Sequence, residues 1–389
     1  MNTIEKDNAY VLPTYARAPI DIVGGKGSLL YDADGKTYID LGTGIAVNTL
    51  GVADEGWCQA VTRQLSLFQH TSNLYYHAPG ATLAETLCKR TGYARVFFSN
   101  SGAEANECAI KAARLYAAKR YGAERYHILT LQNSFHGRTI TTLAATGQEV
   151  FHQDFTPLTD GFHALPIDIE EIRRKMDTLS VAAVMIEPVQ GEGGVVPLPP
   201  AFVKELAALC KERDILLIAD EVQTGNGRTG TLYAYMQYGV EPDILSTAKG
   251  LAGGLPLGAT LMTEAVAGHF TAGMHGSTFG ANPVACAGAC YVLSVLTDEF
   301  LARVSALEAL ARKTLDGARG IVSVTGKGLM LGVEVSGDAG AILAECRARG
   351  VIVLRAKNKI RLLPALNIPE ELFLRGLTVL KDVAAACSP

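Results

Sequence analysis

The sequence predicts an α/β fold in which a large domain with a mostly parallel central sheet is joined to a smaller α+β domain. Apolar runs typical of buried strands, such as Leu179–Glu187 and Ile215–Ala219, alternate with helical stretches through the middle of the chain. Such alternation indicates a parallel sheet covered by helices on both faces. After residue 300 the order changes to strand-like runs with a helix between them, which indicates an α+β unit.

Three segments are expected along the 389 residues. Residues 1–50 form an N-terminal segment that joins the small domain, residues 51–299 form the large domain, and residues 300–389 form the small domain. Within the first segment, alternating residues flank Asp34-Gly35. This pattern predicts a short antiparallel hairpin outside the main sheet.

Composition and charge argue against several classes of protein. The net charge is −4 and no basic run occurs, so nucleic acid is not an expected partner. Met1–Tyr10 lacks the basic and apolar regions of a signal peptide, and the apolar stretch Val284–Leu296 is too short to span a bilayer. The cysteines form no CxxC pair, and Cys286 and Cys290 lack neighbouring metal ligands. We expect a reduced, cytoplasmic protein that uses neither a membrane nor a metal.

An aspartate and a lysine stand in unusual positions between Ile215 and Gly254. Asp220 directly follows the apolar run of one expected strand, and burying a carboxylate without a partner is costly. Lys249 stands between another strand-like run and a glycine-rich turn. Because each residue follows a strand, the pair predicts a site at the carboxyl edge of the sheet.

A third part of the site is expected at the start of a helix over Gly102–Tyr121. This helix follows the strand Arg95–Ser99 and a Ser-Asn-Ser-Gly turn. Its free first-turn amides and the positive end of its dipole favour binding of an anion. An ordinary N-cap by Ser101 is the alternative, although the glycine at position 102 favours close approach of a ligand.

The segment Gly225–Gly230 reads GNGRTG and matches the GxGxxG pattern of dinucleotide-binding folds. Four residues, Glu221–Thr224, separate it from the expected strand end, and it lies deep inside the chain, which disfavours a nucleotide-binding oxidoreductase. An amine, a strand-end carboxylate and an anion-binding helix suit pyridoxal phosphate instead. The lysine would form a Schiff base, and the aspartate would keep the pyridine nitrogen protonated.

Six motifs in sequence order resemble the class III (omega-amino acid) aminotransferases, which have fold type I of the pyridoxal-phosphate-dependent transferases. The motifs are SNSGAEANE, FHGRT, EPVQGEGGV, DEVQTGNGRTG, TAKGLAGGLPLGA and HGSTFGANP. The resemblance extends from Tyr15 to Asn367. FHGR, GEGGV and the compact chain most resemble the members of the family that act on acetylornithine.

The resemblance assigns cofactor roles to residues of this chain. Lys249 would be the Schiff-base lysine and proton shuttle, and Asp220 would pair with the pyridine nitrogen. The other cofactor-binding residues would be Gly102, Ala103, Phe135, Glu221, Val222, Gln223 and Thr278. Because Thr278 would reach the phosphate of the neighbouring subunit, the resemblance implies a homodimer with shared active sites.

The resemblance also implies a substrate site that serves two substrates in turn. Arg138 would bind a substrate carboxylate with Ser277 nearby, and Arg361 would bind the α-carboxylate of glutamate or 2-oxoglutarate. Glu192 would cover Arg361 while the amine donor is bound, because an open arginine would draw the donor's α-carboxylate to the wrong place. A static ion pair between Glu192 and Arg361 is the alternative.

The implied reaction moves the δ-amino group of N2-acetyl-L-ornithine to 2-oxoglutarate, giving N-acetyl-L-glutamate 5-semialdehyde and L-glutamate, in arginine biosynthesis. Succinylornithine, ornithine, 4-aminobutyrate and N-succinyldiaminopimelate remain alternative donors, and a non-catalytic cofactor-binding regulator is a further alternative. The segment Asn48–Gly56 departs from the family pattern NxLGHxHP, which leaves the preferred donor open. His136 is expected to hold its loop, and Glu187 to support the cofactor site.

Overall fold

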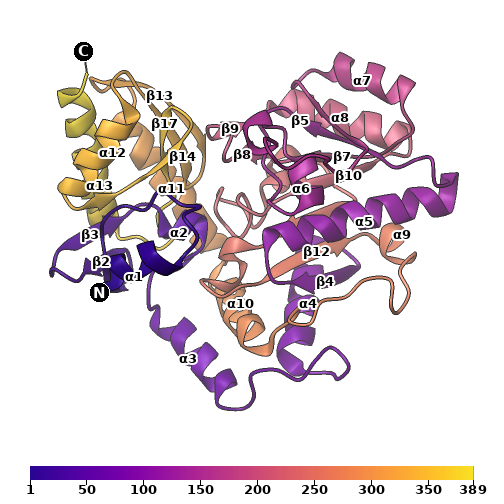
Figure 1. Cartoon of the computed structure of the whole chain (residues 1–389), viewed down its shortest axis with the longest axis horizontal. Coiled ribbons are helices and arrows are strands. Elements are labelled where there is room, and N and C mark those ends of the chain that lie inside the picture. Colours follow the sequence, from indigo (N-terminus) through magenta and orange to yellow (C-terminus); the bar gives the residue numbers. More distant parts are fainter. Residues whose placement is uncertain (389) are drawn as a thin grey trace.

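A seven-stranded sheet forms the centre of the large domain (Figure 1). The computed structural model describes residues 1–388. The strand order is β4-β12-β11-β10-β7-β5-β6, and only β12 runs antiparallel to the others. The strands are β4 (Arg95–Ser99), β5 (His127–Leu131), β6 (Phe162–Leu165), β7 (Val181–Ile186), β10 (Leu216–Asp220), β11 (Ile244–Thr247) and β12 (Gly258–Met262). The predicted, mostly parallel sheet is confirmed.

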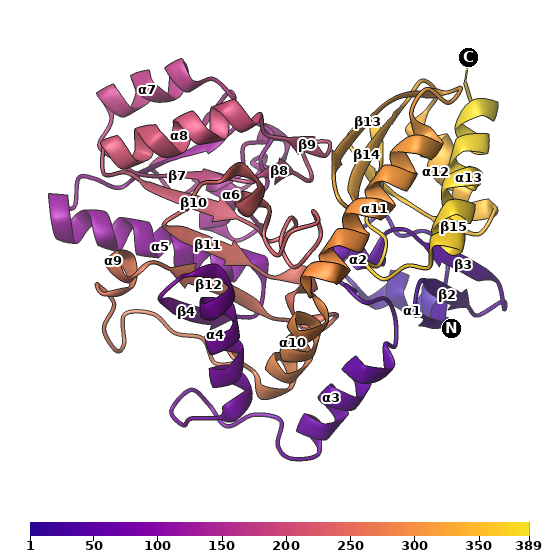
Figure 2. The ribbon, with the colours of Figure 1, turned by 180° about the vertical axis from the view of Figure 1, so that it is seen from behind.

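Helices cover both faces of this sheet, as the alternation of side chains along β7 requires. Ala183 and Met185 pack in a cluster with α5, whereas Val184 and Ile186 pack with α7 and α8. Figure 2 shows α7 and α8 on one side of the sheet and α5 on the other. The helices of this domain are α3 (Glu55–Leu65), α4 (Ala78–Thr91), α5 (Gly102–Tyr121), α6 (Ile140–Ala145), α7 (Ile169–Thr178), α8 (Pro200–Glu212), α9 (Glu264–Ala267) and α10 (Pro283–Val295).

The C-terminal part of the chain forms a second, antiparallel sheet in the order β13-β14-β17-β16. It packs with three helices that lie together in Figure 1. The elements are α11 (Asp298–Leu315), β13 (Ile321–Lys327), β14 (Met330–Val335), α12 (Ala339–Ala348), β16 (Leu354–Ala356), β17 (Lys359–Leu362) and α13 (Glu370–Ala386). The sequence therefore indicated the α+β character of this region correctly.

The N-terminal strands pair with a C-terminal strand, so the two ends of the chain share a sheet. This sheet has the order β1-β2-β3-β15, and the turn at Asp34-Gly35 joins β2 to β3 as predicted. Its strands are β1 (Ile22–Lys26), β2 (Leu29–Asp32), β3 (Thr37–Asp40) and β15 (Val351–Ile352), preceded by α1 (Thr3–Tyr10). The pairing supports a link between the first segment and the small domain, although the boundaries at residues 50 and 300 stay predictions.

Short elements connect these layers and carry several of the expected site residues. They are α2 (Thr43–Ala46), the strands β8 (Val189–Gln190) and β9 (Val196–Pro197), and the 3-10 helices η1 (Glu149–Phe151), η2 (Ala234–Tyr238) and η3 (Lys249–Ala252). Across residues 1–388, no single helix is long and apolar enough to cross a bilayer. By length and composition, only α10 and α11 together meet the criterion, and they are bent by 75°.

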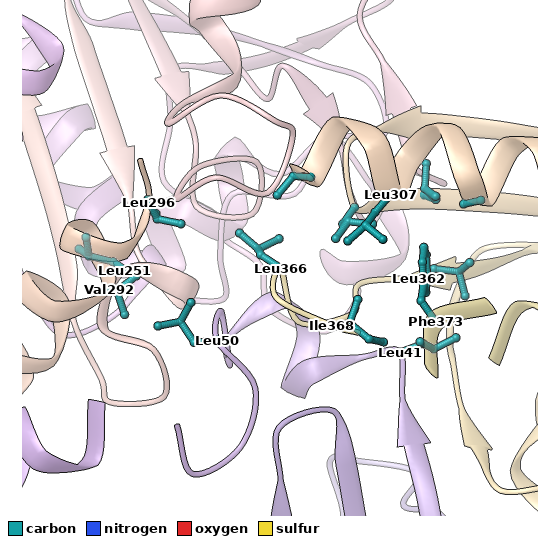
Figure 3. Close-up of a cluster of buried hydrophobic side chains, with 14 of the residues drawn as sticks. Leu41, Leu50, Leu251, Val292, Leu296, Leu307, Leu362, Leu366, Ile368 and Phe373 are labelled. Carbon is teal, nitrogen blue, oxygen red and sulfur yellow. The ribbon is translucent and has the colours of Figure 1, made fainter. Parts of the chain in front are cut away.

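One continuous apolar core joins the two domains (Figure 3). Leu251 and Val292 contribute from the large domain, and Leu362 and Phe373 contribute from the small domain. Leu366 lies between these two groups in Figure 3. Because residue 361 belongs to the strand that carries Leu362, this shared core sets the position of Arg361 relative to the large domain.

Candidate active site

The carboxylate of Asp220 is the centre of a buried polar cluster at the carboxyl edge of the central sheet. Asp220 is the last residue of β10 and is 3% exposed. Its Oδ2 accepts a hydrogen bond from Asn106 Nδ2 at 2.8 Å and lies 2.7 Å from His136 Nδ1. Its Oδ1 accepts a hydrogen bond from the Val222 amide at 3.0 Å. These contacts offset the cost of burying the carboxylate.

Two members of this cluster were not predicted to contact Asp220. His136 was expected only to hold its loop, and its backbone does so, since its amide donates to Thr146 Oγ1 and its carbonyl accepts from Asn106 Nδ2. Asn106 was not singled out at all. It stands four residues after Gly102 on α5, and this spacing on one helix face is the sequence signal that could have identified it.

Lys249 lies next to this cluster because its strand is the neighbour of β10. The parallel strands β10 and β11 pair Asp220 with Ser246. Lys249 follows two residues after β11 ends at Thr247. Lys249 opens η3 with a φ of +44°, in the left-handed region that residues with side chains rarely occupy. Such strain persists only where surrounding contacts hold it, and it is common at functional sites.

Four charged residues, Glu192, Asp220, Arg361 and Glu187, act on the buried amine of Lys249. Burial lowers the pKa of Lys249, and Arg361 acts in the same direction. Glu192, Asp220 and Glu187 oppose this shift, but the pKa remains below its ordinary value. A lowered pKa increases the share of neutral amine, which is the form that attacks a carbonyl carbon.

Glu187 connects two loops from behind the site. Its carboxyl group is buried and accepts hydrogen bonds from the amides of Phe135 at 2.9 Å and Gly191 at 3.4 Å. Burial raises the pKa of Glu187 well above its ordinary value, and the neighbouring Asp220 adds to this effect. Glu187 thus supports both the FHGR loop and the GEGG loop, which agrees with the support expected of it.

Arg361 and Glu192 form an ion pair within the site. Arg361 Nη1 lies 2.5 Å from Glu192 Oε1 and 3.2 Å from Gln223 Oε1, and Gln223 Nε2 donates to Glu192 at 3.4 Å. Burial acts to raise the pKa of Glu192, but Arg361 and Lys249 outweigh it and hold the pKa below its ordinary value. The arginine is therefore covered by an ionised carboxylate.

The N-terminus of α5 fits an anionic group beside Asp220. A Cβ atom on Gly102 would lie 2.6 Å from Val222 Cγ1, so only glycine lets the helix start approach this loop so closely. Ser101 caps the helix by accepting from a first-turn amide, as the alternative reading expected. The amides of Gly102 and Ala103 take part in no hydrogen bond within residues 1–388. Capping and anion binding are thus compatible, since they use different amides.

The FHGR loop places Arg138 and Phe135 side by side. The guanidinium of Arg138 lies over the ring of Phe151, with 4.1 Å from Cζ to the ring centroid, and 5.5 Å from the centroid of Phe135. Arg138 is exposed, and no Asp or Glu lies within salt-bridge distance of it in the described part of the chain. Its positive charge is therefore open to a ligand.

Ser277 and Thr278 lie on a loop beside the start of α5. Ser277 Oγ accepts hydrogen bonds from Asn100 Nδ2 at 3.1 Å and from the Gly280 amide at 2.9 Å. Thr278 is exposed and lines two open hollows of about 400 and 300 Å³. Thr278 is thus accessible to solvent or to a ligand.

The carboxylate of Glu221 does not join the cluster around Asp220. Its oxygens accept hydrogen bonds from Thr224 Oγ1 at 2.5 Å and from the Tyr235 amide at 2.6 Å. Burial raises the pKa of Glu221 to about 7. Successive side chains of an extended segment point to opposite faces, so the residue after Asp220 faces away from the site. The expected cofactor contact of Glu221 is not supported by its side chain.

The fold and this site together define a class of enzyme. The family model "Aminotransferase class-III" matches residues 10–384, and the chain belongs to this family. Its cofactor is pyridoxal phosphate, on which class III aminotransferases depend, and the resemblance seen in the sequence is confirmed.

Individual relatives match nearly the whole chain. It is 48% identical over 380 residues to "Acetylornithine aminotransferase" of Haemophilus ducreyi, covering 97% of each chain. Among solved structures, N-acetylornithine aminotransferase from Stenotrophomonas maltophilia has a TM-score of 0.85 at 36% identity, with 98% of each chain covered. Ornithine aminotransferase from Toxoplasma gondii has a TM-score of 0.93 at 32% identity, with 99% of this chain and 94% of that chain covered.

Proposed function

We propose that the protein transfers the δ-amino group of N2-acetyl-L-ornithine to 2-oxoglutarate, giving N-acetyl-L-glutamate 5-semialdehyde and L-glutamate, in arginine biosynthesis. The observation that carries the proposal is the ion pair between Arg361 and Glu192 beside Lys249. If Glu192 pairs with Arg361 in one half-reaction, the donor can present its terminal amine. If Glu192 leaves Arg361 in the other, the acceptor can bind there through its α-carboxylate. The names of the Haemophilus and Stenotrophomonas relatives support this donor.

Residues of this chain would hold the cofactor at three points. The first-turn amides of α5 at Gly102 and Ala103 would bind its phosphate, Asp220 would accept a hydrogen bond from its ring nitrogen, and Phe135 would cover one face of the ring. Val222 and Gln223 follow Asp220 and would line the ring's edge. When bound, pyridoxal phosphate supplies a carbonyl carbon that captures amines and a ring that delocalises the electron pair left by a departing proton.

The protein's own part in the chemistry centres on proton transfer. The neutral Lys249 amine would accept a proton from the substrate carbon next to the nitrogen and hold it at Nζ. Asp220 is held by its contacts with Asn106, His136 and the Val222 amide, and its carboxylate would favour a positive charge on the ring nitrogen.

The two substrates would use the two arginines differently. With Glu192 on Arg361, only Arg138 is open to a carboxylate, so the α-carboxylate of acetylornithine binds there and its terminal amine points to Lys249. With Glu192 displaced, Arg361 and Gln223 receive the α-carboxylate of 2-oxoglutarate. The movement would replace one charge-assisted hydrogen bond of the Arg361 guanidinium with another.

A panel of donors tests the proposed substrate. With 2-oxoglutarate as acceptor, we expect kcat/KM for acetylornithine to exceed that for ornithine and 4-aminobutyrate by at least about tenfold, equivalent to one good polar contact. Succinylornithine and N-succinyldiaminopimelate complete the panel, since both carry an acyl group. A higher kcat/KM for any of the other donors would replace acetylornithine in the proposal, and a colourless protein that binds NAD would reject the transaminase itself.

The variant Glu192→Ala tests the cover on Arg361. We expect transfer from the α-amine to rise about 10- to 100-fold relative to transfer from the terminal amine, because the freed arginine gains a charge-assisted hydrogen bond to the donor's α-carboxylate. The ratio is measured with ornithine, which carries both amines. Glu192→Gln is the matched control that keeps the shape but removes the charge. An unchanged ratio in both variants would favour a static ion pair.

The proposal includes a homodimer with shared active sites. The exposed Thr278 would reach the phosphate of the second copy, and the nearby Leu74, Tyr75 and Tyr76 are 85%, 71% and 108% exposed. Apolar side chains this open favour burial against a partner. A solution mass of one 41.2-kDa chain in sedimentation experiments would reject the dimer.

The cysteines stand as free thiols, which supports a reducing compartment such as the cytoplasm.

A further inference from the structure

The backbone around Lys249 adopts a conformation that needs support from elsewhere in the fold. Lys249 has a φ of +44°, and Gly253 and Gly254 follow with φ of +64° and +135°. The only regular element in this segment is the four-residue 3-10 helix η3, whose internal hydrogen bonds are few. A single turn of this kind cannot hold a strained lysine by itself.

Three side chains from other segments donate hydrogen bonds to carbonyl groups of this turn. The bonds run from Asn226 Nδ2 to Ala248 O at 3.1 Å, from Thr49 Oγ1 to Gly250 O at 2.8 Å, and from Trp57 Nε1 to Ala252 O at 2.9 Å. The bonded carbonyls lie just before Lys249, just after it, and three residues after it. The turn is therefore fastened on both sides of the lysine.

Glycines stand where Thr49 and Trp57 approach the turn, and a larger residue at these positions would clash with them. A Cβ atom on Gly250 would lie 2.5 Å from Thr49 Oγ1, and a Cβ atom on Gly253 would lie 2.9 Å from Trp57 Nε1. A Cβ atom on Gly288 of α10 would lie 2.8 Å from the same nitrogen. The turn and α10 thus leave a slot that the indole edge of Trp57 fills.

Thr49 also connects the turn to the small domain. While its hydroxyl donates to the turn, its carbonyl accepts a hydrogen bond from the Leu366 amide at 2.9 Å. The next residue, Leu50, lies in the same apolar core as Leu251 of the turn (Figure 3). Thr49 is 1% exposed, so no solvent competes for its hydroxyl.

We propose that Thr49 and Trp57 are positioning residues that hold Lys249 in its reactive orientation. Both lie in or directly after Asn48–Gly56, the segment in which the chain departs from the family pattern. Residues of this segment help to place Trp57. The Asp54 side chain caps α3 by accepting a hydrogen bond from the Trp57 amide, and Gly56 leaves room for the ring of Tyr291. This inference rests on the proposed role of Lys249, but it does not depend on which donor the enzyme uses.

The test compares Thr49→Val and Trp57→Phe with the control Tyr93→Phe in the cofactor-loaded enzyme. Tyr93 is a buried aromatic residue whose hydroxyl donates to the Pro242 carbonyl at 2.8 Å, away from the Lys249 turn. Each variant removes one hydrogen bond to a backbone carbonyl, so losses of thermal stability are expected in all three. Thr49→Ser restores the hydroxyl and serves as the rescue.

Two readouts separate positioning from stability. In Thr49→Val and Trp57→Phe, we expect kcat to fall on the order of tenfold with KM changed less than about twofold, because a misplaced lysine slows chemistry more than binding. We also expect the pH midpoint of the bound cofactor's visible absorption to shift by about half a unit or more, since burial of the amine changes. Tyr93→Phe and Thr49→Ser should leave both quantities at their wild-type values.

The proposal is overturned if Thr49→Val and Trp57→Phe change the melting temperature but leave kcat and the pH midpoint as in Tyr93→Phe. If Trp57→Phe does not fold, the comparison of Thr49→Val with Thr49→Ser decides the question alone. A wild-type protein without any visible absorption after incubation with pyridoxal phosphate would reject the proposed function, and the positioning role with it. Normal absorption with equal midpoints would reject the positioning role only.

Discussion

Replacing Lys249 with alanine is expected to lower turnover by at least about 10⁴-fold, the upper end of what a single acid–base group contributes. The loss should be this large because one amine would both attach the cofactor and move the proton. The measurement is single-turnover formation of keto product, together with the visible absorption of the bound cofactor. We expect that absorption to move toward the spectrum of free pyridoxal phosphate.

The control for this variant is Lys359→Ala. Lys359 is a partly buried lysine on β17, whose Nζ donates to Thr325 Oγ1 at 3.1 Å in the small domain. The substitution Lys359→Ala removes the same kind of side chain outside the proposed site, so turnover should stay within about threefold of wild type. Turnover in Lys249→Ala that is close to this control would show that the attaching lysine has been assigned wrongly.

Replacing Asp220 is expected to have the second-largest effect. In Asp220→Asn the shape is kept, but the charge that favours a protonated ring nitrogen is lost, so turnover should fall about 10²- to 10³-fold. Asp220→Ala should be at least as slow and should retain part of its cofactor, because the lysine and the α5 amides remain. Both variants are measured by kcat and by titration of the apoprotein with pyridoxal phosphate.

Asp243→Asn provides the matched control for Asp220→Asn. Asp243 is a partly buried aspartate that accepts a hydrogen bond from the Leu217 amide at 2.9 Å, beside the same strand β10 but before the start of β11. The two substitutions are chemically identical and differ in their distance from Lys249. Full activity in Asp220→Asn, or equal losses in both variants, would contradict the role assigned to Asp220.

Local rules explain why part of the fold was predictable. The unit from Arg95 to Tyr121 was expected as strand, turn and helix, and the structure gives the same bounds for β4 and α5. Its apolar run, serine cap and alanine-rich helix follow from local preferences. By contrast, α3 and α7 were not predicted, although both helices are strongly amphipathic. Their hydrophobic period was therefore a helical signal in the sequence that went unused.

Only those site residues that stand at strand ends or in recognisable motifs could be predicted from the sequence. Asp220 and Lys249 could be placed together because each follows a strand of a parallel sheet. The contacts of Asn106 and His136 with Asp220 join residues 114 and 84 positions apart in the chain. They depend on how α5 and the FHGR loop pack against β10, and no local pattern specifies that packing.

The position of Trp57 makes the Lys249 turn observable without any label. Trp57 is the only tryptophan among the 389 residues, so excitation of the indole yields emission from one place. Its ring nitrogen donates a hydrogen bond to the carbonyl of Ala252, within the turn that begins at Lys249. Fluorescence of the native chain therefore reports the state of this turn during cofactor loading, substrate exchange and unfolding, each in real time and on unmodified protein.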